Sequence, residues 1–203
     1  MVECTSRSDI LKKTFIGLLS CLLIGLLAAC STNANSDEAT YSVQKEKVMI
    51  TDDRFLIGAT GVRNEKGGWE DILPKALYYE FTLKQDDEQA NYKHDKDEVR
   101  GSILPDKDLK QASIDVLGVN IFEKNQDTYG YRCSIKGFDD SKTGKVTLQY
   151  YVGAEVKNNK MPLAPSDEEL QKLKNVANHA TLVLTRDDKE IGRYSLETLK
   201  ETK

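Results

Sequence analysis

Regular alternation of apolar and polar side chains is the feature that most constrains how this chain folds. It runs through residues 76–84 and again, over a longer stretch, through 146–156. Because successive side chains of a strand point to opposite faces of a sheet, this period of two predicts strands with one face buried in a core. On the buried face of the first strand we expect four large side chains: Leu77, Tyr79, Phe81 and Leu83.

Shorter apolar runs, separated by charged or glycine-containing segments, predict further strands. These runs are 47–51, 55–59, 129–136, 181–186 and 191–196. The last two flank a short polar turn and are expected to form a hairpin. Residues 113–122 are predicted as a strand pair or a bulged strand, because Gly118 interrupts them. The charged segment 85–100 has almost no apolar residue and is predicted as a long mobile loop.

One helix is expected, over residues 167–180. Ser166 precedes Glu169 by three residues, which is the spacing of a reciprocal capping box. Apolar residues then recur at helical spacing: Leu170, Leu173, Val176, Ala177 and Ala180. Several short strands with one late helix predict a mainly β protein, an antiparallel β-sandwich of which an immunoglobulin-like arrangement is one form. The alternative is an α+β fold, with the helix packed across one curved sheet.

The first thirty residues have the pattern of an export signal. Lys12 and Lys13 form a basic region, and an apolar run follows from Phe15 to Leu27. This run is shorter than the roughly 20 residues that a membrane-spanning helix needs. Acidic residues precede it at Glu3 and Asp9, which suits such a signal poorly, so translation is expected to begin at Leu11.

Cys30 directly follows the small residues Ala28 and Ala29. The sequence Leu27-Ala28-Ala29-Cys30 resembles the lipobox of bacterial lipoproteins. The resemblance implies that residues 1–29 are removed and that the Cys30 thiol carries diacylglycerol. Two or three acyl chains hold a protein stably on a membrane without spanning it. The alternatives are a plain signal peptide with an accidental cysteine and an uncleaved membrane anchor.

The residues after Cys30 divide into a tether and a domain. Residues 30–45 are mostly small and polar and show no periodicity, so we expect a lipidated, flexible tether. About fifteen such residues span roughly 20 Å. Residues 46–203 are expected to form a single β-rich globular domain.

Charge and cysteine content exclude several kinds of site. The chain has a formal net charge of −4, and because three basic and two acidic residues precede Cys30, the mature part carries −5. This balance argues against nucleic acid as a partner. Cys133 is the only other cysteine after the signal, so an intramolecular disulfide and a multi-cysteine zinc site are excluded. On a strand face with Tyr131 and Ile135, it is expected to be a buried, inert thiol.

The two histidines do not predict a catalytic or metal site. His94 lies in a segment of mixed charge, where a solvated loop is favoured over a metal site. His179 lies near the end of the predicted helix and is interpreted as a hydrogen-bonded residue at the core boundary. We therefore predict no catalytic residue, no metal ligand and no cofactor.

Adjacent tyrosines suggest a binding face. Tyr78 and Tyr79 have opposite strand parity, as do Tyr150 and Tyr151, so one of each pair faces away from the core. Tyr78, Tyr151 and Trp69, in its glycine-containing loop, are the candidates for a binding face. In the alternative interpretation, a helix covers this outer face.

The sequence as a whole predicts an extracytoplasmic lipoprotein, anchored to the cell membrane, that acts as a binding module. Its partner is expected to be an envelope protein or a cell-wall ligand. The alternatives are an assembly subunit of an envelope complex, which an extended apolar patch would favour, and a hydrolase with an unrecognised site. A cluster of perturbed carboxylates in a deep cleft would favour the hydrolase.

Overall fold

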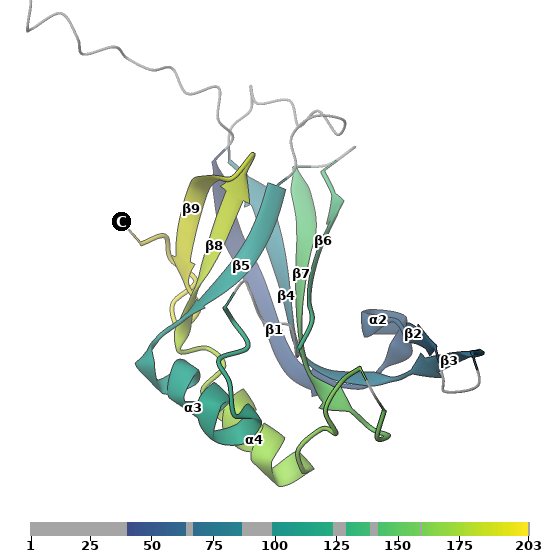
Figure 1. The fold of residues 1–203 in the computed structure, drawn as a ribbon. Coiled ribbons are helices and arrows are strands. Elements are labelled where there is room, and N and C mark those ends of the chain that lie inside the picture. The colour runs from purple at the N-terminus through teal and green to yellow at the C-terminus, as the bar shows by residue number, and fades with distance from the viewer. Residues whose placement is uncertain are drawn as a thin grey trace, which may run out of the picture. The chain divides into compact units, whose positions relative to one another are not determined.

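A computed structural model describes residues 40–63, 67–86, 99–123, 129–138, 142–158 and 160–202. These residues form two antiparallel sheets and a small hairpin beside them (Figure 1). The first sheet has the order β1 (Tyr41–Thr51), β4 (Pro74–Gln85), β7 (Thr143–Ala154), β6 (Tyr131–Gly137). The second has the order β5 (Val99–Pro105), β8 (Ala180–Arg186), β9 (Lys189–Ser195). The hairpin consists of β2 (Thr60–Arg63) and β3 (Trp69–Ile72).

The strand pairing is that of a constant-type immunoglobulin sandwich. When the hairpin is set aside, the seven remaining strands can be lettered A to G in chain order. The first sheet then reads A-B-E-D and the second C-F-G, as in that fold. The predicted β-sandwich is therefore confirmed, and Cys133 is the one cysteine among its described residues.

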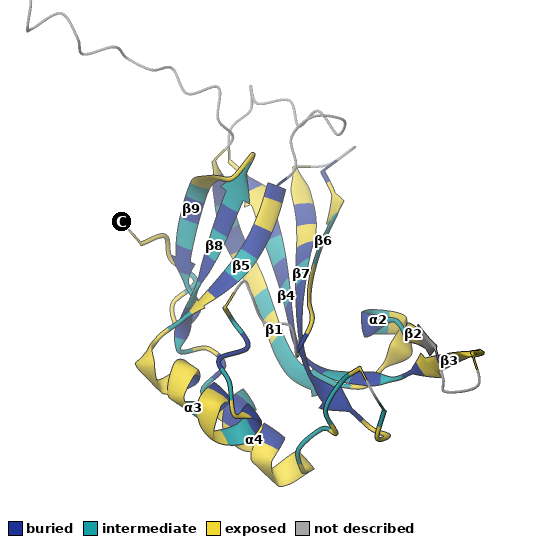
Figure 2. Cartoon of the chain, in the orientation of Figure 1, coloured by how far each residue is buried: buried dark blue, intermediate teal, exposed yellow. Residues whose placement is uncertain are grey.

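The core between the sheets follows the predicted alternation. Leu77, Tyr79, Phe81 and Leu83 of β4 are all fully buried. They pack in one cluster with side chains from β7 and from the facing sheet, including Val146, Leu148, Tyr150, Val152, Ile103, Leu182 and Leu184. Figure 2 shows buried stretches along β4, β7 and β8.

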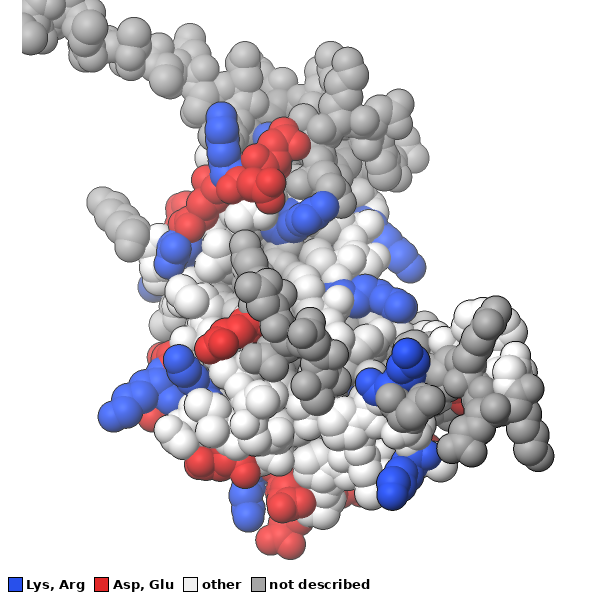
Figure 3. Space-filling view, viewed as in Figure 1, with Lys and Arg blue, Asp and Glu red and all other residues white. Residues whose placement is uncertain are grey.

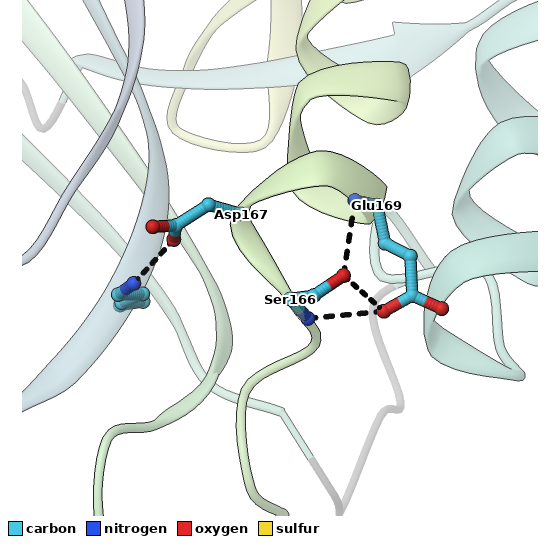
Figure 4. A network of polar contacts seen from close by, with 4 residues as sticks. Ser166, Asp167 and Glu169 are labelled. Atoms are coloured by element: carbon cyan, nitrogen blue, oxygen red, sulfur yellow. Dashed lines mark hydrogen bonds and ion pairs between the residues drawn. The ribbon is translucent and has the colours of Figure 1, made fainter.

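Helices α3 (Lys107–Leu117) and α4 (Asp167–Asn175) lie at one end of the sandwich (Figure 1). The predicted capping box begins α4. The Ser166 backbone N–H donates to Glu169 Oε2 at 3.0 Å, and the Glu169 N–H donates to Ser166 Oγ at 3.3 Å (Figure 4). Lys75 Nζ of β4 binds Asp167 Oδ1 at 2.7 Å. The helix ends at Asn175, earlier than predicted, because the chain then makes two tight turns into β8.

The prediction of a strand at 113–122 is wrong, because the first half of this stretch belongs to α3 and the rest forms turns. Asp106 caps the helix, accepting hydrogen bonds from the N–H groups of Asp108 at 2.9 Å and Leu109 at 3.0 Å. Gly118, with φ of 76°, ends it in the left-handed conformation that favours glycine. The buried residues Leu109, Ser113 and Leu117 follow at intervals of four, a helical period that a count of apolar residues alone does not reveal.

Two further segments differ from the predictions. Residues 55–59 were expected to be a strand, but Arg54–Ile57 form the short helix α2, which begins at the Asp53 cap. Tyr41–Lys45, assigned to the tether, belong to β1, where Tyr41 and Val43 are buried. The Tyr41 hydroxyl accepts a hydrogen bond from Arg186 Nη2 at 2.8 Å.

Of the other predictions on the chain, one hairpin is confirmed, one loop is wrong at its ends, and the rest of that loop and the export signal lie outside the described part. β8 and β9 form the predicted hairpin, turning at Asp187 and Asp188 with φ of 49° and 63°, as a two-residue hairpin turn requires. The predicted mobile loop 85–100 is wrong at its ends, because Gln85 belongs to β4 and Val99 and Arg100 belong to β5. Residues 87–98 of this loop, the export signal and Cys30 lie outside the described residues. Within the described part of the chain, no helix has the length and apolar character needed to cross a membrane.

Candidate binding surface

The outer face of the first sheet is covered, which corrects the prediction for two tyrosines. Tyr78 and Tyr151 do point away from the main core, as their parity predicts, but only 3% and 6% of their surfaces are exposed. They form a second, smaller apolar cluster with Ile57 and Ala76, packed against Met49, Leu56 and Met161. The covering layer includes helix α2, so these tyrosines support a surface rather than form one.

Side chains of the first sheet hold α2 in place. Gln149 of β7 donates from Nε2 to the Leu56 carbonyl at 3.0 Å, and Arg132 of β6 donates from Nη1 to the Ile57 carbonyl at 3.4 Å. At the other end, Asp53 Oδ1 accepts from the Phe55 N–H at 2.9 Å. A helix of four residues is not stable alone, so these contacts and the burial of Ile57 determine its position.

The covering layer itself exposes large aromatic side chains. We call α2 together with the β2–β3 hairpin the aromatic lobe. Phe55 is 95% exposed and Trp69 is 73% exposed. The Trp69 ring lies over Gly61, where an added Cβ would be 3.5 Å from ring atom Cε3. Arg54 and Asp71 form an ion pair of 3.8 Å that joins α2 to β3. Trp69 is thus the one predicted binding residue that the fold leaves accessible.

Two more exposed apolar residues lie in the segment after β7. Val156 is 72% exposed and Leu163 is 59% exposed. Leu163 pairs with Ala154 in a parallel bridge, and the Glu155 N–H donates to the Leu73 carbonyl at 3.4 Å, next to the end of β3. Four of the seven large exposed hydrophobic residues in the described part of the chain therefore lie in the aromatic lobe or in this adjoining segment.

A polar groove of about 700 Å³ lies elsewhere, between β1, the residues after α4 and the segment 196–199. Glu46 lines it from β1. Burial raises the pKa of the Glu46 carboxyl to about 7, and its Oε1 has no hydrogen-bond partner among the described residues. His179 lines the groove from the other side, with 37% of its side chain exposed, which suits the predicted boundary position.

Cys133 lies half-buried on β6, where the Gly101 N–H of β5 donates to its Sγ at 3.3 Å. The neighbouring Tyr131 hydroxyl donates to the Gly101 carbonyl. The thiol therefore takes part in a contact between the edges of the two sheets, and it is half-buried, not fully buried as predicted. His94 lies outside the described residues.

Sequence interpretation missed Phe55 and Glu46. The signal for Phe55 was Asp53, a good helix cap directly before it, which argues against a strand at 55–59. The signal for Glu46 was a charged residue at an inward position of an edge strand, a device that discourages strand pairing between molecules. No protein-family model, curated protein or solved structure matches this chain, so a functional argument rests on these surfaces.

Proposed function

We propose that this protein is a membrane-anchored, extracytoplasmic lipoprotein that binds an envelope protein or a cell-wall ligand through its aromatic lobe. The observation that carries the proposal is the exposure of Phe55 and Trp69 on a lobe whose helix α2 is held by side chains of the first sheet. Burying one such side chain contributes about 1.5–3 kcal/mol. Tryptophan is also among the residues most enriched where binding energy concentrates.

The direction of β1 supports a partner away from the anchor. A lipid on Cys30 attaches to the domain through Tyr41, the first residue of β1, whereas α2 begins three residues after Thr51 at the strand's other end. Eleven strand residues extend about 34 Å. Tyr41 and α2 therefore lie toward opposite ends of β1 (Figure 1), which supports a protein or cell-wall partner over the lipid headgroups.

The alternative of a hydrolase is less well supported. A hydrolase that works with a pair of carboxyl groups needs environments that push their two pKa values apart within one cleft. In the described part of the chain, the carboxyl with a raised pKa is Glu46. The two with a lowered pKa are Glu169, held by the Ser166 cap, and Glu190, held by Arg193. Neither Glu169 nor Glu190 lines the groove with Glu46.

The test is crosslinking in intact cells, comparing the wild type with the Phe55→Ala, Trp69→Ala double variant. We expect the wild type to capture a discrete partner and the double variant to lose it. Leu104→Ala is the matched control, because Leu104 is a 49% exposed apolar residue on β5 and should not affect capture. Undiminished capture by a folded double variant would exclude the aromatic lobe as the binding face.

Anchoring is tested separately with Cys30→Ala. We expect the wild type to fractionate with membranes and the variant to be released or to remain uncleaved. Unchanged size and acylation in the variant would contradict the lipoprotein assignment.

An assembly subunit would differ from a binding module in the crosslinking experiment with the Phe55 and Trp69 variants. Its crosslinked product would have a fixed stoichiometry within a larger complex.

A further inference from the structure

A second group of side chains gathers where the start of α3 meets the turn after α4. Asp106, Asp108 and His179 each offer one ligand atom, and these atoms all lie within 4.8 Å of one another. His179 Nδ1 is 3.6 Å from Asp108 Oδ2. The Asp106 N–H donates to the His179 carbonyl at 3.0 Å, so a backbone hydrogen bond fixes the two segments beside each other.

The first two side chains are held in position by the helix. Asp106 uses Oδ1 to cap α3, accepting from two backbone N–H groups. Its other carboxylate oxygen makes none of these capping bonds and remains able to bind an ion. Asp108 lies in the first turn of the same helix.

The third side chain, His179, has a carboxylate near its second ring nitrogen, Nε2. His179 Nε2 lies 3.8 Å from Glu197 Oε1, in the segment after β9. A histidine that binds a metal commonly directs its second nitrogen to a carboxylate, which fixes the orientation of the ring. With Glu197 on one side, the His179 Nδ1 lone pair can point toward Asp106 and Asp108.

Charge in this group is not balanced. Three carboxylates, of Asp106, Asp108 and Glu197, surround one imidazole. Within the described ranges, no lysine or arginine forms an ion pair with any of the three. Acidic and basic side chains both lie on the face of the molecule that Figure 3 shows. An excess of negative charge around an imidazole attracts a cation.

We propose that Asp106, Asp108 and His179 bind a divalent transition-metal cation of the zinc or manganese class, with Glu197 as a positioning residue. Imidazole suits zinc, and carboxylate suits both ions. Ligands of tetrahedral zinc, at bond lengths of about 2.1 Å, lie about 3.4 Å apart, close to the 3.6 Å between His179 Nδ1 and Asp108 Oδ2. The proposal is independent of the binding role of the aromatic lobe.

The test is calorimetric titration of the full chain, purified in detergent, with Zn²⁺ and with Mn²⁺. We expect one ion to bind per chain. Asp108→Asn and His179→Gln should each lower the affinity by more than tenfold, and Glu197→Gln by about tenfold. Asp115→Asn, on the same helix but outside the group, is the matched control and should bind as the wild type does.

Circular dichroism without metal establishes that each variant is folded. If Asp108→Asn or His179→Gln does not fold, Asp106→Asn replaces it, because asparagine caps a helix as well as aspartate does. The proposal is overturned if neither ion binds at about 1 mM. It is also overturned if Asp108→Asn and His179→Gln leave the affinity unchanged, since the ion would then be bound elsewhere, for example by a cysteine.

Discussion

The two faces of the β4–β7 pair are made by the same two strands, yet they are covered in different ways. On the inner face, a second sheet and two helices enclose a large apolar cluster. On the outer face, α2 and a few side chains enclose a cluster with four buried members. The inner face therefore determines whether the domain folds, whereas the outer face determines where the aromatic lobe lies.

Adjacent tyrosines illustrate this difference. On the inner face, the Tyr79 hydroxyl donates to the Ala177 carbonyl at 3.0 Å, and the Tyr150 hydroxyl accepts from the Ile103 N–H at 2.8 Å. Each bond joins β4 or β7 to a different part of the fold. On the outer face, the buried Tyr151 hydroxyl has no partner among the described residues. The Tyr78 hydroxyl donates to Glu80 Oε2 of its own strand at 3.5 Å. The inner tyrosines therefore connect different parts of the fold by hydrogen bonds, whereas this bond of Tyr78 stays within one strand.

The largest expected effect comes from Tyr79→Ala compared with Tyr78→Ala. Both side chains are buried. Tyr79→Ala should lower the free energy of unfolding by about 3–5 kcal/mol, because the surrounding sheets cannot collapse into the space. Tyr78→Ala should cost about 2 kcal/mol, because the short helix α2 can move inward. Urea denaturation followed by circular dichroism measures both, and equal costs would refute the proposed difference between the faces.

A smaller effect is expected when only the hydroxyl is removed. Tyr150→Phe leaves the buried Ile103 N–H unpaired and should cost about 1–3 kcal/mol. Tyr151→Phe removes a hydroxyl without a partner in the described structure, so stability should stay the same or rise slightly. Thermal unfolding of the two variants decides the point. A loss in Tyr151→Phe as large as in Tyr150→Phe would reveal a hydrogen bond from outside the described residues.

The inner side of β1 carries one group that should make stability depend on pH. Burial raises the pKa of Glu46 from 4.5 to about 7 in the folded state. Between these values the folded protein keeps a proton that the unfolded chain releases, so the free energy of unfolding should fall as pH rises from about 5 to about 7 and then level off. Because the side chain is only partly buried, we expect a total loss of about 1–2 kcal/mol.

Glu46→Gln should remove this pH dependence and be more stable than the wild type at pH values above about 7. Glu155→Gln, at an exposed position, is the matched control and should retain the wild-type dependence. Urea denaturation at a series of pH values measures the slope for all three proteins. If Glu46→Gln keeps the wild-type slope, another group is responsible.

Much of the inner face could be predicted from the sequence because its signals are local. The alternation at 76–84 needs only the geometry of a single strand, and the Ser166–Glu169 box needs only one helical turn. The parity of Tyr78 and Tyr151 was predictable for the same reason. What covers these tyrosines was not, because α2 has four residues and is held by Gln149 and Arg132 from distant strands.

The candidate sites likewise depend on contacts between distant segments, which the sequence does not reveal. Trp69 could be selected because it stands in a glycine-containing segment, but its position over Gly61 depends on the pairing of β2 with β3. The approach of His179 to Asp106 and Asp108 depends on how two segments far apart in the chain meet at the end of the sandwich. Only packing of the whole domain brings such groups together.

The smallest expected effect separates binding from folding within one helix. Phe55 and Ile57 both belong to α2, but Phe55 is 95% exposed and Ile57 is 1% exposed. Phe55→Ala should change the free energy of unfolding by less than about 0.5 kcal/mol, whereas Ile57→Ala, the comparison variant, should lose about 2 kcal/mol. Thermal unfolding and crosslinking of the same samples measure both properties. If Phe55→Ala abolishes capture at unchanged stability, Phe55 contacts the partner directly, because its removal disturbs nothing beneath it. If Phe55→Ala destabilises the protein as much as Ile57→Ala does, Phe55 stabilises the fold. The loss of capture could then not be assigned to a direct contact between Phe55 and the partner.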